Sequence, residues 1–78
     1  MYFAGEENAP KRILILSAIR QEAPVSVDRL SGMLEGAGYE VPSRKWLMRQ
    51  LDAARKRNQV VRLQSGEYAL TLKTLKDL

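Results

Sequence analysis

The chain has 78 residues, of which 45% are hydrophobic and 28% are charged, and its net charge at pH 7 is +4. A chain of this length forms at most one domain with a small core, and this composition is typical of a globular domain. It has no cysteine and no histidine, which excludes disulfides, thiolate and imidazole metal ligands and the commonest general base.

The sequence also argues against an enzyme, a membrane protein and a secreted protein. Without histidine, no serine has the usual base that activates a nucleophile, so we expect no enzyme activity, no cofactor and no metal. The apolar run Ile13–Leu16 is four residues long, far shorter than a membrane span. No basic segment precedes an apolar run near the N-terminus, so we expect no secretory signal and a cytoplasmic location.

The first predicted helix covers Lys11–Glu22 and follows a flexible leader, residues 1–9. Pro10 fits the first turn of this helix, where its missing N–H costs nothing. Ala23-Pro24 ends the helix, because the residue before a proline avoids the helical conformation. The side chains that share the core-facing stripe are expected to be Ile15, Leu16 and Ile19.

A second helix is predicted to begin after Ser26, a good N-cap, and to end at Gly36 and Gly38. Val25, just before the cap, is expected to make one short extended pair. Residues 39–42 form a connector. The apolar residues that recur along this second helix at helical spacing are Val27, Leu30, Leu34 and Ala37.

The third predicted helix, residues 43–57, begins with a Ser43 cap and carries most of the positive charge. Residues 44–57 hold six basic side chains and one acidic, whereas residues 1–43 hold four basic and six acidic. At about 100° per residue, one side forms a buried stripe of Leu47, Leu51 and Ala54. The opposite side carries Lys45, Arg49, Asp52 and Lys56. One basic element on a mildly acidic scaffold indicates an anionic partner.

Within this helix, Asp52 is expected to pair with Arg49 or Lys56, and Trp46 is expected at the edge of the core. A two-stranded hairpin follows, with Asn58 as a left-handed cap and a short loop over Gln64–Glu67. The hairpin residues expected to pack on the core are Val61, Leu63, Tyr68 and Leu70. The tail, residues 73–78, is expected to add one helical turn.

Three stretches carry a family resemblance. They are ILSAIRQEAPVSVDRLSGML, SRKWLMRQLDAARKRNQVVRL and GEYALT. These stretches resemble parts of the winged helix-turn-helix superfamily. The first stretch resembles its first helix, short strand and second helix. The second resembles its recognition helix with the first wing strand, and the third resembles its second wing strand. The resemblance covers roughly residues 11–72. It implies an α+β fold over residues 10–72, a three-helix bundle with a C-terminal two-stranded β-hairpin wing, and a bacterial or phage DNA-binding regulator of transcription.

The sequence departs from that pattern in two places. The connector over residues 36–42 is longer than the turn of a minimal helix-turn-helix. The loop over Gln64–Glu67 carries no basic residue, whereas a wing that grips phosphate normally does.

The resemblance implies that the third helix enters the major groove of double-stranded DNA. Lys45 and Arg49 lie near its N-terminal half, which reaches base edges in helix-turn-helix docking. Ser43 and Arg44 suit phosphate contacts. The candidate DNA-binding residues are Ser43, Arg44, Lys45, Arg49, Lys56 and Arg57. The other interpretation is a solvated basic face, since cations near a helix C-terminus also favour the helix dipole.

Proteins are the alternative partners. A winged helix also serves as a protein–protein interaction module or an assembly subunit without sequence-specific DNA binding. Ile13 and Leu14 add apolar surface to the first helix beyond its core stripe. They predict a homodimer through this helix and the termini, in keeping with two-fold dimers that bind paired operator half-sites.

Overall fold

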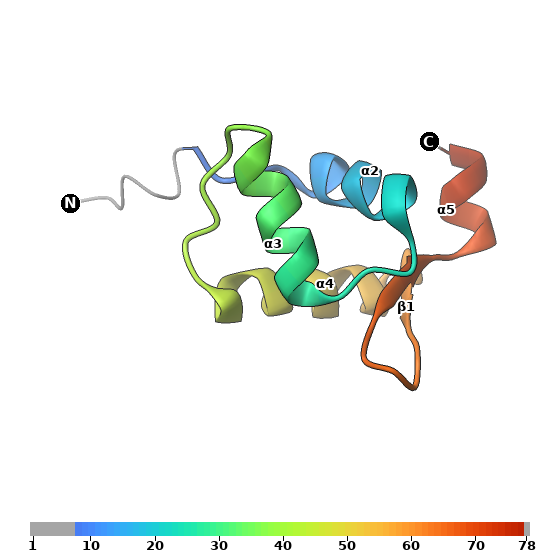
Figure 1. Ribbon diagram of the computed structural model, residues 1–78. Coiled ribbons are helices and arrows are strands. Elements are labelled where there is room, and N and C mark those ends of the chain that lie inside the picture. Colours follow the sequence, from blue (N-terminus) through green and yellow to red (C-terminus); the bar gives the residue numbers. More distant parts are fainter. Residues whose placement is uncertain (1–7, 78) are drawn as a thin grey trace.

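The computed structural model describes residues 8–77 as a small α+β domain, with four helices and one antiparallel hairpin in this part of the chain (Figure 1). The elements in chain order are α2 (Arg12–Glu22), α3 (Val27–Gly36), α4 (Arg44–Lys56), β1 (Val60–Arg62), β2 (Tyr68–Leu70) and α5 (Leu72–Asp77). This order is compatible with the expected winged helix. Of the predicted leader, residues 1–9, the first seven residues lie outside the described part of the chain. Asn8 is attached to the connector, since its side-chain amide donates to the Gly38 carbonyl at 3.0 Å and its carbonyl accepts from the Glu40 N–H at 3.0 Å.

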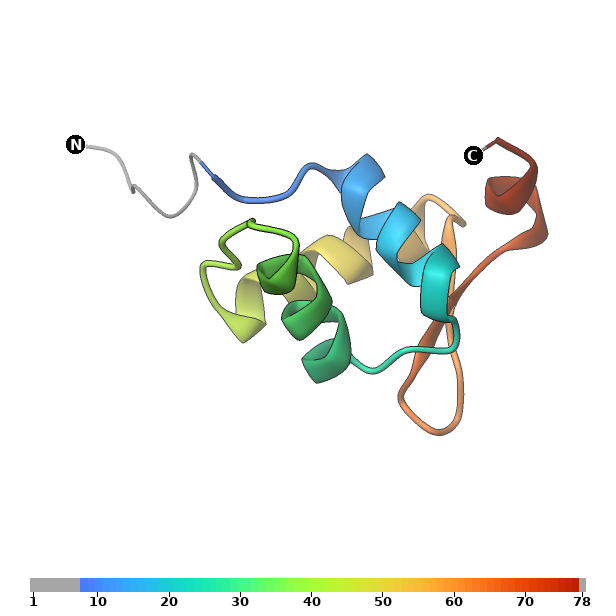
Figure 2. The ribbon, with the colours of Figure 1, turned by 45° about the horizontal axis from the view of Figure 1, so that its top comes forward.

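The helices α2, α3 and α4 surround a common centre, with the hairpin at one end and α5 beyond it (Figures 1 and 2). One face of each of these three helices is buried, which confirms the predicted helical stripes. The core consists of Ile15, Leu16, Ile19, Val25, Val27, Leu30, Leu34, Leu47, Leu51, Ala54, Val60, Tyr68 and Leu70. Ala37, which recurs at helical spacing in the sequence, is exposed, because α3 ends at Gly36 and Ala37 is its C-cap.

Both predicted serine caps are confirmed. The Ser26 hydroxyl accepts a hydrogen bond from the Arg29 N–H at 3.1 Å, and the Ser43 hydroxyl accepts one from the Trp46 N–H at 3.0 Å. The prediction that Pro10 lies in the first turn of the helix was wrong, because α2 begins two residues later, at Arg12. The first helical hydrogen bonds of α2 run to the Lys11 carbonyl, so Pro10 precedes the N-cap and is buried instead.

The face of β1 that packs on the core is the opposite of the one predicted. Val60 is 2% exposed, whereas Val61 is 42% exposed and Leu63 is 40% exposed. Val60 lies opposite Leu70 and Val61 lies opposite Ala69. Because side chains alternate along a strand, a shift of one residue moves the whole set to the other face. The predicted burial of Val61 and Leu63 was therefore wrong.

The hairpin is attached to the helices through Val25, which forms the predicted extended pair. The Val25 N–H donates to the Tyr68 carbonyl at 3.0 Å, and the Tyr68 N–H donates to the Val25 carbonyl at 2.7 Å. These two bonds place the inner strand β2 beside the connection between α2 and α3. Tyr68 is 2% exposed, as expected for a core residue.

The predicted turn in the tail is confirmed as α5. It begins at Leu72, one residue before the predicted tail, and Leu72 is 78% exposed. Thr71 caps this helix, since its hydroxyl oxygen accepts from the Thr74 N–H at 3.3 Å. Asn58 adopts the predicted left-handed conformation, with φ of 60°. No helix within residues 8–77 is long and apolar enough to span a membrane.

Candidate nucleic-acid interface

The position of α4 is set by its buried side. Leu47 and Leu51 are 0% exposed and Ala54 is 1% exposed. Trp46 lies at the edge of the core, as predicted, and is partly buried against it. Because the inner side is enclosed by the core, α4 cannot rotate about its axis without exposing these side chains, and its outer face has a fixed direction.

The outer face of α4 carries cations with no internal partner. Lys45, Arg49 and Lys56 are exposed, and none of the three makes a hydrogen bond or ion pair with any residue between 8 and 77. Lys45 and Arg49 are four residues apart, one helical turn, and therefore share one side of the helix. The structure thus brings these three predicted residues together on one surface.

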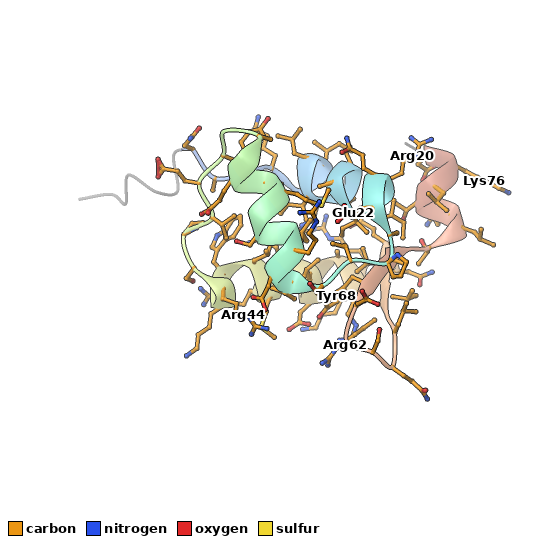
Figure 3. All side chains as sticks on the ribbon, viewed as in Figure 1. Arg20, Glu22, Arg44, Arg62, Tyr68 and Lys76 are labelled. Atoms are coloured by element: carbon orange, nitrogen blue, oxygen red, sulfur yellow. The ribbon has the colours of Figure 1, made fainter. Side chains whose placement is uncertain are left out.

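At the start of α4, Ser43 and Arg44 are exposed but already make contacts within the molecule. The Ser43 hydroxyl oxygen is engaged as the helix cap. The Arg44 Nε donates to the Asp28 carboxylate at 3.0 Å, and its Nη1 lies 3.4 Å from the Met48 sulfur. Figure 3 labels Arg44 at this end of α4. The pairing with Asp28 was not expected, because the two residues are 16 positions apart.

The charged residues at the C-terminal end of α4 have different surroundings. Asp52 pairs with Arg55, with 3.6 Å between the carboxylate oxygen and the guanidinium nitrogen, so the predicted partners Arg49 and Lys56 were wrong. Arg57 follows the helix as its C-cap and lines a separate groove of about 230 Å³ beside α5. Arg57 therefore does not lie with Lys45 and Arg49.

One cation beside α4 was missed by sequence reasoning. A groove of about 640 Å³ separates the C-terminal half of α4 from β1. Arg55, Lys56 and the Arg55 partner Asp52 line it on the α4 side, and Arg62 lines it on the other. Arg62 belongs to the hairpin and is exposed (Figure 3). Its guanidinium lies over the hairpin turn, since Nη2 is 3.9 Å from where a Cβ on Gly66 would stand. The loop over Gln64–Glu67 has no basic residue, but Arg62 in β1, the strand that leads into this loop, supplies one.

A bidentate ion pair joins the end of α2 to the start of α3. Arg29 Nη2 donates to Glu22 Oε1 at 2.7 Å, and Arg29 Nε donates to Glu22 Oε2. The hydrogen bond from Arg29 holds the pKa of the exposed Glu22 carboxyl below its ordinary value. This pair ties α3 to the end of α2, and so helps to set where α3 meets α4.

We call Lys45, Arg49, Arg55, Lys56 and Arg62 the cationic surface. It joins a convex helix face to a groove with positive charge on both walls, and such a surface favours a polyanion. Comparisons with protein-family models, with curated proteins and with solved structures found no match for this chain. Its function is therefore argued from the cationic surface and the fold.

Proposed function

We propose that this chain is a winged helix-turn-helix protein that binds double-stranded DNA, and that it acts as a small transcriptional regulator. In this proposal α3 and α4 are the helix-turn-helix pair, α4 is the recognition helix, and the β1–β2 hairpin is the wing. The observation that carries it is the outer face of α4, where Lys45 and Arg49 are exposed without a described partner, directly opposite a fully buried stripe.

The dimensions of α4 support this assignment. Its 13 residues make a helix about 20 Å long, and the major groove of B-DNA is about 12 Å wide and admits one α-helix. Arg49 is assigned to a guanine edge, where a guanidinium makes two hydrogen bonds, and Lys45 to an adjacent base. Both side chains belong to the N-terminal half of α4, the part that approaches bases in helix-turn-helix docking.

The remaining cations are assigned to the DNA backbone. Arg55, Lys56 and Arg62 line the groove between α4 and β1, so a sugar-phosphate strand seated there meets positive charge from both sides. Contacts of this kind position a protein on the duplex without selecting a sequence. They also make binding dependent on salt, because each neutralised phosphate releases counterions.

The test is a DNA titration of the full chain by fluorescence anisotropy at several salt concentrations, with duplexes first selected from a random pool. If four or five cations meet phosphates, the logarithm of the affinity should fall against the logarithm of the salt concentration with a slope on the order of −4. Arg49→Ala should cost roughly 1–3 kcal/mol of binding free energy and relax the preference at one base pair.

A charge-matched control separates the surface from the net charge. The double variant Lys45→Ala, Arg49→Ala and the double variant Lys11→Ala, Lys76→Ala each remove two positive charges. Lys11 and Lys76 are exposed outside the cationic surface, so the second variant should bind nearly as well as the parent. If the first variant also binds as well as the parent, the major-groove assignment is wrong, and the interaction-module alternative takes its place.

Self-association stays a prediction. Ile13 is 52% exposed on α2, and Leu14 beside it is half-buried, so the apolar surface expected there is present. A homodimer through α2 would present two copies of α4 to paired half-sites. Light scattering at protein concentrations well above micromolar should give the mass of a dimer, and a monomer mass would contradict this hypothesis.

A further inference from the structure

Arg44 and Asp28 form an ion pair at the edge of the cationic surface. Arg44 is the first residue of α4 and directly precedes Lys45, and Asp28 lies in the first turn of α3. The Arg44 Nε and the Asp28 Oδ1 are 3.0 Å apart, and the two side chains are 61% and 79% exposed. The pair is therefore open to solvent and to any ligand that reaches Lys45.

Within the described residues, the side chain of Asp28 contacts Arg44 alone. Its carboxylate makes no hydrogen bond or ion pair with a residue in that range other than Arg44. The cap of α3 is supplied by Ser26, whose hydroxyl already accepts the Arg29 N–H. Asp28 therefore has two effects: its charge in the first turn of α3 favours the helix dipole, and its carboxylate holds the Arg44 guanidinium toward α3.

We propose that Asp28 competes with DNA phosphate for Arg44 and so limits how tightly the protein binds the DNA backbone. This inference rests on the proposed function. A carboxylate and a phosphate both offer anionic oxygens to the same guanidinium nitrogens. A phosphate that reaches Arg44 must displace the Asp28 oxygen, and it approaches a negative charge as it does so. Asp28 therefore weakens every backbone contact made through Arg44, whatever the base sequence.

The competition is modest in size, because exposed ion pairs are easily opened. The measured strength of such pairs corresponds to a factor of about 1.4 to 5 in an equilibrium constant. Asp28 thus tunes affinity and does not block it. The expected signature is an increase in affinity that depends on the presence of Arg44, since the competition needs both members of the pair.

The experiment is a double-mutant cycle on duplex DNA of random sequence, at several salt concentrations, with the full chain. Asp28→Asn keeps the size of the side chain and removes its charge. In the parent background it should tighten binding and make the salt slope steeper by about one unit. In the Arg44→Ala background its effect should be smaller by a factor of about 1.4 to 5, and the slope should stay unchanged.

The control is Glu35→Gln, which removes one negative charge at the other end of the same helix, where Glu35 is exposed. It should change the affinity by less than about twofold, since charges a Debye length or more away are screened. Equal tightening by Asp28→Asn with and without Arg44 would show simple repulsion and overturn the competition. No tightening would overturn it as well. If the parent binds no duplex at all, the proposed function fails with it, so the two failures are distinguishable.

Discussion

Truncating Val60 and Val61 in turn tests which side of β1 faces the core. Val60→Ala and Val61→Ala make the same chemical change in adjacent residues of one strand. Val60 is 2% exposed and lies opposite the buried Leu70, whereas Val61 is 42% exposed and lies opposite Ala69. Each variant is therefore the control for the other, and both carry the same loss of intrinsic strand propensity.

The expected magnitudes follow from burial. Val→Ala removes two methyl carbons, each worth about 0.8 kcal/mol when buried. A residual cavity adds to this at an enclosed site, so Val60→Ala should lower the free energy of unfolding by about 2 kcal/mol. At Val61 the space is open to water and no cavity forms, so the loss should stay below about 1 kcal/mol.

The assay is thermal or urea unfolding followed by circular dichroism. For a domain of this size, 1 kcal/mol corresponds to a shift in Tm of about 4–8 °C, so Val60→Ala should lower Tm by at least twice as much as Val61→Ala. Equal losses, or a larger loss for Val61→Ala, would mean that Val61 faces the core. That result would refute the register described for the hairpin.

Three further expectations concern the cap of α5, acid sensitivity and the hairpin loop. Thr71→Ala removes the hydroxyl that caps α5 at Thr74 and should cost about 1 kcal/mol of stability by urea unfolding, while Thr71→Ser should recover most of it. Arg29 lowers the folded pKa of Glu22 below its ordinary value of 4.5. The pair therefore stabilises the folded state fully above that value, and this stability is lost as the pH falls through the folded pKa. Thermal unfolding from neutral to acidic pH should show Glu22→Gln to be less acid-sensitive than the parent. Glu67→Lys should tighten non-specific duplex binding in an anisotropy titration, because it replaces a charge that repels the backbone, and Glu67→Gln should give a smaller gain.

The helices and the buried side of each could be predicted from local patterns in the sequence. The stripe of Leu47, Leu51 and Ala54 recurs at a helical period, and that period places cations on the opposite side of α4 wherever the helix packs. Ser26 and Ser43 were recognisable as caps for a related reason. A cap bonds to an N–H three residues later in the chain, so its signal lies within one turn and needs no tertiary context.

The face of the hairpin that packs on the core and the partners of the charged side chains depend on contacts between separate elements of the fold. In the stretch Val60–Leu63 one alternating phase holds Val61 and Leu63 and the other holds Val60 and Arg62, so the pattern favours the face that the structure exposes. The face is selected by pairing with β2, which Val25 holds in place from 43 residues away in the chain. Arg44 finds Asp28 on another helix, and Arg62 stands across a groove from α4. Arg44 and Asp28 are 16 residues apart, and Arg62 is separated from α4 by a turn and the start of β1. The packing of α3, α4 and the hairpin around one core sets which of these charges lie near each other.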